Sequence, residues 1–246
     1  MQVEVFLTGD NVAENDIRDH TVVVIDVLRT STTIAGALMN GARAVVPAAD
    51  MGEASTLAAN LDPESCLLGG ERSGLMIEGY RFGNSPLEYT REKVLGKTLI
   101  LNTTNGTPSI RRVRHAEHLI VGAFVNAGVV VDFIREADLD LVIVCAGWRN
   151  RVSLEDTLCA GMLLSELWDG TEPESSTDTA HIAFTLYQNE RADVAGAVRR
   201  SRHGKRLAAM DRMADVDFCG SINTVPVLPY YLDSQLVSRT VSAVAT

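Results

Sequence analysis

The sequence has no apolar run close to the roughly 20 residues that a membrane-spanning helix needs, and residues 1–5 lack the basic start of a secretory signal. Aromatic residues make up only 5% of the 246-residue chain, although 46% of it is hydrophobic. Cysteine is scarce too: four cysteines lie far apart, among apolar neighbours, and form no C-x-x-C pair. These absences argue against a membrane protein or a disulfide scaffold, and we expect a soluble, cytoplasmic protein with reduced thiols.

Basic residues are in the minority. Lysine and arginine number 22 against 32 acidic residues, so the formal net charge is −10. Long-range repulsion therefore disfavours binding to nucleic acid or to an acidic membrane surface, and an anionic substrate must meet a local basic site. The sequence also lacks a glycine-rich nucleotide fingerprint, a zinc-like histidine spacing and an evident Ser-His-Asp order.

Short β-branched runs alternate with helical stretches through most of the chain. The alternation predicts an α/β fold of three layers, in which helices cover both faces of a mostly parallel or mixed central sheet. Ligands of such sheets usually bind at the carboxyl ends of the strands. The expected strands are 3–7, 21–26, 44–47, 65–68, 98–102, 118–122 and 139–145, and the expected helices are 32–40, 52–60, 109–114 and 126–136.

The chain is expected to form one domain over residues 1–246 that is rich in helix from about residue 153. The polar, acidic segment 170–178 is linker-like, and we expect it to be a surface loop. A domain boundary there is the alternative, and it would leave a C-terminal part of about 70 residues to build its own core.

The segment 22–33 starts as an apolar strand and ends in an acid, an arginine and four consecutive hydroxyl residues. It predicts that Asp26 lies at the carboxyl end of the strand and that Ser31 caps the next helix. Free N–H groups at a helix start favour oxyanions, and Arg29 adds a cation suited to phosphate or sulfonate. The alternative is that Asp26 is only a turn residue and Ser31 only an N-cap.

Two later segments place similar residues just after a strand. Gly69-Gly70-Glu71-Arg72 again combines an acid with an arginine, although a glycine turn with a solvated ion pair would have the same sequence. Thr103-Thr104-Asn105-Gly106-Thr107 places hydroxyls, an amide and a glycine before a helix. Backbone amides near Gly106 could hold an oxyanion, and an ordinary tight turn is the alternative.

Two adjacent carboxylates follow the last expected strand. Glu155 and Asp156 lie in Ser153-Leu154-Glu155-Asp156, at the same sheet edge as Asp26. Such carboxylates suit Mg²⁺, which prefers one or two of them together with water and substrate oxygens. The alternative is a simple helix cap, because Ser153 and Asp156 match a capping pattern and acids in the first turn complement the helix dipole.

His203 lies within 199–206, the one basic cluster of an acidic protein. The cluster is either a solvated face or a flap that closes over a dianionic substrate. Together with the oxyanion-binding segments it favours phosphoryl transfer to water, which needs positioned charge more than special side-chain chemistry. Two alternatives stay open: a haloacid-dehalogenase-like phosphatase with an aspartyl-phosphate on Asp26, although Leu28 stands where such enzymes have a second acid, and a non-catalytic anion-binding protein.

Five ordered segments span nearly the whole chain and resemble the 2-phosphosulfolactate phosphatase family. They are Asp26-Val27-Leu28-Arg29-Thr30-Ser31-Thr32-Thr33, Gly69-Gly70-Glu71-Arg72, Gly83-Asn84-Ser85-Pro86, Thr103-Thr104-Asn105-Gly106-Thr107 and Ser153-Leu154-Glu155-Asp156. The resemblance continues more loosely in Ser201-Arg202-His203-Gly204 and Asp217-Phe218-Cys219. It implies a magnesium-dependent phosphatase that converts 2-phospho-3-sulfolactate to sulfolactate and phosphate, a step of coenzyme M synthesis.

The residues and the resemblance together lead to one set of expected roles. The cofactor is Mg²⁺, the substrate is a small anionic phosphorylated acid, and the apolar content leaves room for a homodimer. Asp26, Arg29 and His203 would be catalytic, with His203 protonating the leaving alkoxide. The expected metal ligands are Asp26, Glu71, Glu155 and Asp156, and the expected substrate-binding residues are Ser31, Thr32, Arg72, Thr104, Asn105 and Gly106.

Overall fold

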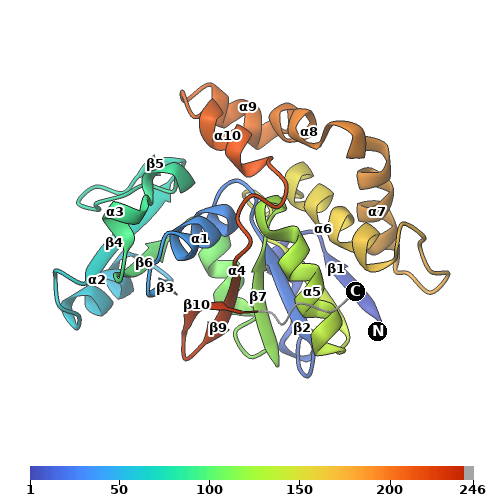
Figure 1. Ribbon diagram of the computed structural model, residues 1–246, viewed down its shortest axis with the longest axis horizontal. Helices are drawn as coiled ribbons and strands as arrows, with labels where there is room; N and C mark the ends of the chain where they lie inside the picture. The colour runs from blue at the N-terminus through green and yellow to red at the C-terminus, as the bar shows by residue number, and fades with distance from the viewer. Residues whose placement is uncertain (241–246) are drawn as a thin grey trace.

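The computed structural model describes residues 1–240 and contains a ten-stranded mixed sheet with helices on both faces (Figure 1). The strand order is β1-β8-β2-β7-β9-β10-β3-β6-β4-β5. The α/β expectation is therefore confirmed. The strands are β1 Val3–Phe6, β2 Thr21–Ile25, β3 Ala44–Pro47, β4 Cys66–Arg72, β5 Leu75–Met76, β6 Thr98–Asn102, β7 His118–Gly122, β8 Leu141–Cys145, β9 Leu228–Leu232 and β10 Gln235–Arg239.

The sheet consists of two parallel halves joined by an antiparallel hairpin. Strands β1, β8, β2 and β7 run parallel, and so do β3, β6 and β4. The hairpin β9–β10 pairs antiparallel with β7 on one side and with β3 on the other. These two strands were not among the expected ones, although a mixed sheet was expected.

Strands β2 and β8 of the first half are buried along their whole length, as expected for central strands of a parallel sheet, whereas β1 at the edge is only partly buried. Val23 and Ile25 of β2 pack in one core with α5 and α6, whereas Val22 and Val24 pack in another with α1 and α4. The helices are α1 Thr30–Met39, α2 Met51–Ala59, α3 Arg91–Val94, α4 Gly106–Arg112, α5 Ala127–Ala137, α6 Leu154–Leu167, α7 Asp178–Glu190, α8 Val194–Arg200, α9 Arg202–Ala208 and α10 Met213–Cys219, with short 3₁₀ turns η1 Gly9–Asn11, η2 Glu14–Asp16, η3 Pro86–Glu88, η4 Phe124–Asn126 and η5 Arg191–Asp193.

The sheet curves strongly around α1 and α4 (Figure 1). Strands β2 and β6 are five positions apart in the sheet, which in a flat sheet would separate them by roughly 24 Å. The residues that follow them nevertheless touch, because the Thr30 hydroxyl donates to the Thr103 hydroxyl at 3.2 Å. Curvature thus brings together two strand ends that lie in different halves of the sheet.

The C-terminal helices α8, α9 and α10, orange in Figure 1, lie beyond α1 and next to the loops that follow the strands. From residue 154 to residue 219 the chain consists of the helices α6 to α10 and their connections, and the strands β9 and β10 follow. The segment 170–178 connects α6 to α7, two helices that pack closely against each other. Within residues 1–240, no helix is both long and apolar enough to cross a membrane.

The start of α1 differs from the expectation. The helix begins at Thr30 and its N-cap residue is Arg29, without a side-chain cap bond, so Ser31 already lies inside the helix. The Ser31 hydroxyl instead accepts the backbone N–H of Asp26 at 2.8 Å. The prediction that Ser31 caps the helix was therefore wrong, because its side chain bonds back to the strand end.

Candidate active site

A polar cavity lies where the loops after β2, β4, β6 and β8 meet helix α9. Two acids, Asp26 and Glu71, line it together with three arginines, Arg29, Arg149 and Arg206. His203 and Trp148 line it as well, as do Thr30, Asn84, Thr104 and Asn105. The carboxyl edge of the sheet therefore collects both signs of charge in one place, as expected for an α/β ligand site.

Asp26 lies directly after β2 and is almost completely buried. Burial raises the pKa of its carboxyl to about 6; the Thr30 hydrogen bond and the charge of His203 oppose this shift, whereas the charge of Glu71 adds to it. Gly106 packs against the same carboxylate, since a Cβ atom there would lie 2.5 Å from Asp26 Oδ2. The Asp26 carboxylate is thus held between the start of α1 and the start of α4.

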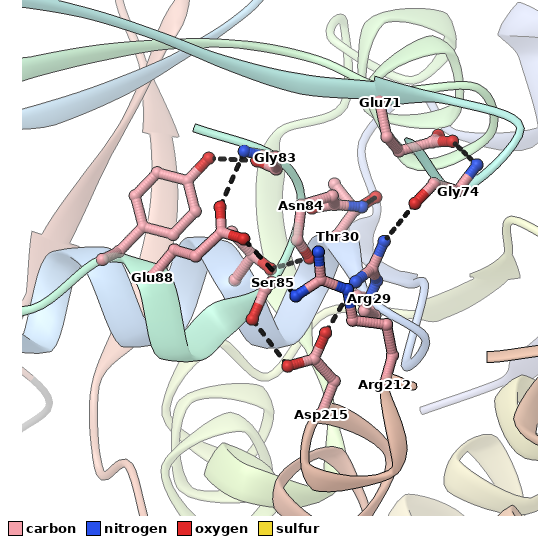
Figure 2. Close-up of polar contacts among 12 residues, drawn as sticks. Arg29, Thr30, Glu71, Gly74, Gly83, Asn84, Ser85, Glu88, Arg212 and Asp215 are labelled. Carbon is pink, nitrogen blue, oxygen red and sulfur yellow. Dashed lines mark hydrogen bonds and ion pairs between the residues drawn. The ribbon is translucent and has the colours of Figure 1, made fainter. Parts of the chain in front are cut away.

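Glu71, at the end of β4, is fixed by two backbone donors. Its Oε1 accepts the N–H of Thr104 at 2.8 Å, and its Oε2 accepts the N–H of Gly74 at 2.7 Å. One carboxylate therefore ties the turn after β4 to the loop after β6 while it faces the cavity. Figure 2 shows the Glu71 and Gly74 contact above Arg29.

Arg29 is buried and reaches two partners from its position between β2 and α1. Its Nη1 donates to Asp215 Oδ2 of α10 at 2.6 Å, and both side chains are only 4% exposed. Its Nη2 donates to the carbonyl of Gly74 at 3.3 Å (Figure 2). Arg29 is also one of the residues that line the cavity.

Glu155 and Asp156 lie at the start of α6 behind the cavity. Ser153 caps this helix by accepting the N–H of Asp156 at 3.4 Å, which confirms the capping pattern. Asp156 uses one oxygen for the N–H of Val27 at 2.8 Å and the other for the N–H of Gly147 at 3.1 Å. Burial raises the pKa of Asp156 well above its ordinary value, and the nearby charge of Glu155 adds to this shift.

His203 lies over Glu155, with 3.6 Å between its Nδ1 and Oε1 of Glu155. Burial by itself would raise the pKa of Glu155, but the hydrogen bond and charge of His203 outweigh burial, so the pKa is lowered. The other face of the imidazole stacks on Trp148, with ring centroids 5.6 Å apart. A carboxylate and an aromatic ring together fix the orientation of His203.

The four expected metal ligands do not form one compact cluster. Among residues 1–240, no group of three or more His, Cys, Asp or Glu side chains lies close enough to hold a metal ion. Asp26 and Glu71 face the cavity, whereas Glu155 pairs with His203 and Asp156 bonds to the backbone. The donor set that fits Mg²⁺ is therefore the pair Asp26 and Glu71, which leaves coordination positions for water and phosphate oxygens.

Three expected substrate-binding side chains point elsewhere. The Thr32 hydroxyl donates to the carbonyl of Val27 at 3.0 Å, and that of Ser31 is engaged with Asp26. Arg72 donates to both the carbonyl and the side-chain oxygen of Asn102, on the side of β6. Thr104 and Asn105 do line the cavity. Thr30 lines it as well, in place of the expected Ser31 and Thr32.

Sequence reasoning missed Trp148, Arg149 and Arg206. The Arg149 and Arg206 guanidinium carbons lie 4.9 and 5.8 Å from the Trp148 ring centroid, and that of Arg202 lies 5.0 Å away. Cations over an aromatic face are held by its negative charge distribution. The available signal was the basic cluster 199–206, whose contact with the loop after β8 is not visible in the sequence.

Comparisons with known proteins agree over nearly the whole chain. The sequence model of a family described as 2-phosphosulpholactate phosphatase matches residues 6–234, which include every residue of the cavity. A protein of Gloeobacter violaceus named probable 2-phosphosulfolactate phosphatase is 40% identical over 230 residues, 93% of this chain and 94% of that protein. A protein of the same name from Clostridium acetobutylicum is 35% identical over 237 residues, 96% of this chain and 100% of that protein.

Proposed function

The chain belongs to the 2-phosphosulfolactate phosphatase family, and from this premise we propose that its cavity hydrolyses 2-phospho-3-sulfolactate, or a related phosphorylated 2-hydroxy acid, to the hydroxy acid and phosphate. The observation that carries the proposal is the composition of the cavity. Two buried acids, Asp26 and Glu71, face the same space as the three arginines 29, 149 and 206. Such an arrangement suits a substrate with several negative charges and a cation that offsets the acids.

Asp26 and Glu71 would hold the Mg²⁺ ion. Their carboxylate oxygens are hard donors of the kind that Mg²⁺ prefers, and the backbone bonds of Glu71 orient it before any ion binds. The bound ion would neutralise charge that develops on the phosphoryl oxygens in the transition state. The two acids repel each other, and this repulsion contributes to the raised pKa of Asp26. A cation bound between them would relieve the repulsion.

The arginines would divide the anionic groups of the substrate between them. Arg29 is the buried one, next to Asp26, and we assign it to the phosphoryl group. Arg149 and Arg206 lie on the Trp148 side and would hold the sulfonate or the carboxylate. Arg206 is anchored there because its Nη2 donates to the carbonyl of Ser73 at 2.5 Å.

His203 would donate the proton that the leaving alkoxide needs. Its Nδ1 faces Glu155, so Nε2 is the atom left to act as general acid. Water would attack phosphorus while the P–O bond to the 2-hydroxy acid breaks, and the proton from Nε2 would complete the alcohol. The attacking water would keep one proton on the phosphate product and lose the other to solvent, and solvent would return a proton to His203. Glu155, whose pKa is lowered, places a carboxylate opposite Nδ1 and so orients the ring.

The test is phosphate release from a panel of phosphorylated 2-hydroxy acids with and without Mg²⁺. We expect turnover that needs the cation and is fastest with the sulfonate-bearing substrate. Asp26→Asn should abolish the response to Mg²⁺, whereas Asp169→Asn, on an acid that is 91% exposed, should behave as the unsubstituted protein. Asp26→Asn with undiminished Mg²⁺-dependent turnover would contradict the metal assignment.

The same protein and substrates distinguish the proposal from its two alternatives. An aspartyl-phosphate enzyme would trap a covalent phosphoryl group or fluoroberyllate on Asp26, and direct attack by water would not. A non-catalytic binding protein would gain thermal stability from phosphosulfolactate without consuming it. Inactivity across the whole panel, combined with such a gain in stability, would refute the phosphatase proposal.

A further inference from the structure

Asp215 of α10 makes a buried contact that reaches the cavity through another residue. Its Oδ2 accepts Nη1 of Arg29 at 2.6 Å, and its Oδ1 accepts the hydroxyl of Ser85 at 2.6 Å (Figure 2). Both carboxylate oxygens are therefore engaged. Asp215 is 186 residues from Arg29 in the chain and does not itself line the cavity.

The geometry restricts Arg29 to one orientation. The Gly74 carbonyl accepts Nη2 at 3.3 Å, so both terminal nitrogens of Arg29 are held, Nη1 by Asp215 and Nη2 by Gly74. The guanidinium group is planar and has five N–H donors in a fixed fork. Once Asp215 and Gly74 hold one edge, the plane of the fork is set and the donors that remain are directed by it.

The electrostatics add to this restriction. A buried guanidinium without a partner is strongly destabilised, and Asp215 is the acid that forms its ion pair. Exposed pairs such as Arg199 and Asp217 on the neighbouring surface have much less influence, because water screens them. Helix α10 thus contributes a charge next to the cavity without lining it.

We propose that Asp215 is a positioning residue, which holds Arg29 in the orientation that stabilises the phosphoryl group in the transition state. The inference rests on the proposed function and extends it to a residue outside the cavity. Misplacement of a catalytic group by about 1 Å can lower the rate by roughly 100-fold, so a loss of this order is expected when Asp215 is removed.

The test is a double-mutant cycle with Arg29→Ala, Asp215→Ala and the combined variant. Asp215→Ala should lower kcat/KM by about 10- to 100-fold, mostly through kcat, because Arg29 meets charge that develops in the transition state. The double variant should match Arg29→Ala within about twofold, because Asp215 acts only through Arg29. Asp217→Asn, on the same helix, is the matched control and should leave kcat and KM unchanged.

Several outcomes would overturn the proposal: wild-type kinetics in Asp215→Ala, a rise in KM alone, or losses that simply multiply in the double variant. The double variant also covers a failure of Asp215→Ala to fold, since it removes both buried charges together. If the unsubstituted protein hydrolyses none of the substrates, the proposed function fails on its own. In that case the Kd for inorganic phosphate is measured by calorimetry for the same three variants. Similar losses of affinity in Asp215→Ala, Arg29→Ala and the double variant support the positioning role. Unchanged affinity in Asp215→Ala, or losses that multiply in the double variant, overturn it.

Discussion

Alanine in place of Gly106 should strongly lower the activity of the enzyme while leaving it folded. The new Cβ would lie 2.5 Å from Asp26 Oδ2 and 2.5 Å from Thr30 Cβ, whereas ordinary contact begins near 3.4 Å. Each of the two contacts must therefore lengthen by about 0.9 Å, so Asp26 and Thr30 both move relative to Gly106. Gly106 has no left-handed backbone conformation, so the substitution acts through this contact and not through backbone strain.

The magnitudes separate stability from activity. Overpacking costs about 1–3 kcal/mol, and alanine at a helical position returns up to about 1 kcal/mol, so the net loss of stability is at most about 3 kcal/mol. For a chain of this length that is a fall in Tm of roughly 12 °C or less. A displacement of Asp26 close to 1 Å should lower kcat/KM by about 100-fold.

The assay is phosphate release together with thermal unfolding, and Gly36→Ala is the matched control. Gly36 lies inside α1, and a Cβ there would meet only the carbonyl oxygen of Pro86 at 3.9 Å, an ordinary contact. Gly36→Ala should keep full activity and gain about 1 kcal/mol of stability from helix propensity. Unchanged kcat/KM in Gly106→Ala would refute the view that the two strand ends position Asp26.

Three further substitutions or treatments test other parts of the structure. Gly161→Ala should destabilise the fold by about 1–3 kcal/mol, because its Cβ would lie 2.0 Å from the carbonyl oxygen of Ala183 where α6 meets α7; chemical denaturation measures this loss. Burial raises the pKa of Cys219 to about 12, so at pH 8 iodoacetamide should label the partly exposed Cys66 and not Cys219 in the native protein. Mass spectrometry measures the labelling, and Cys219 labelled as fast as Cys66 would contradict its burial. Trp148→Leu should lower kcat/KM about tenfold because the imidazole of His203, the proposed general acid, loses its stacking partner, and steady-state kinetics with unaltered constants would show that the ring is dispensable.

The elements that follow from local pattern were predicted well. Strands 44–47, 98–102 and 118–122 have the bounds expected from their β-branched runs, because a strand buried on both faces must be continuously apolar. The hairpin β9–β10 was missed for a physical reason. Pro229 argues against a central strand, and the turn Asp233-Ser234 has positive φ angles of 49° and 65° without the glycine that usually marks such a turn.

Of the four expected acids, Asp26 and Glu71 line the cavity, whereas Glu155 and Asp156 do not. Asp26 and Glu71 could be assigned because each directly follows or ends a strand, and the edge of the sheet decides where they lie. Arg72 has the same sequence context but turns toward Asn102, since successive residues of a strand point to opposite faces. The ion pair of Arg29 depends on a contact with α10, which no local pattern encodes.

The curvature of the sheet explains why the site needs the whole chain. Asp26 follows β2 in one parallel half, and Gly106 follows β6 in the other, yet the two residues are in contact. The hairpin β9–β10 lies between these halves and pairs with both, so the last two strands of the described residues join the two parts of the sheet. Each half contributes only one wall of the cavity, and Asp26 and Glu71 face the same space only because the curved sheet brings the two halves together.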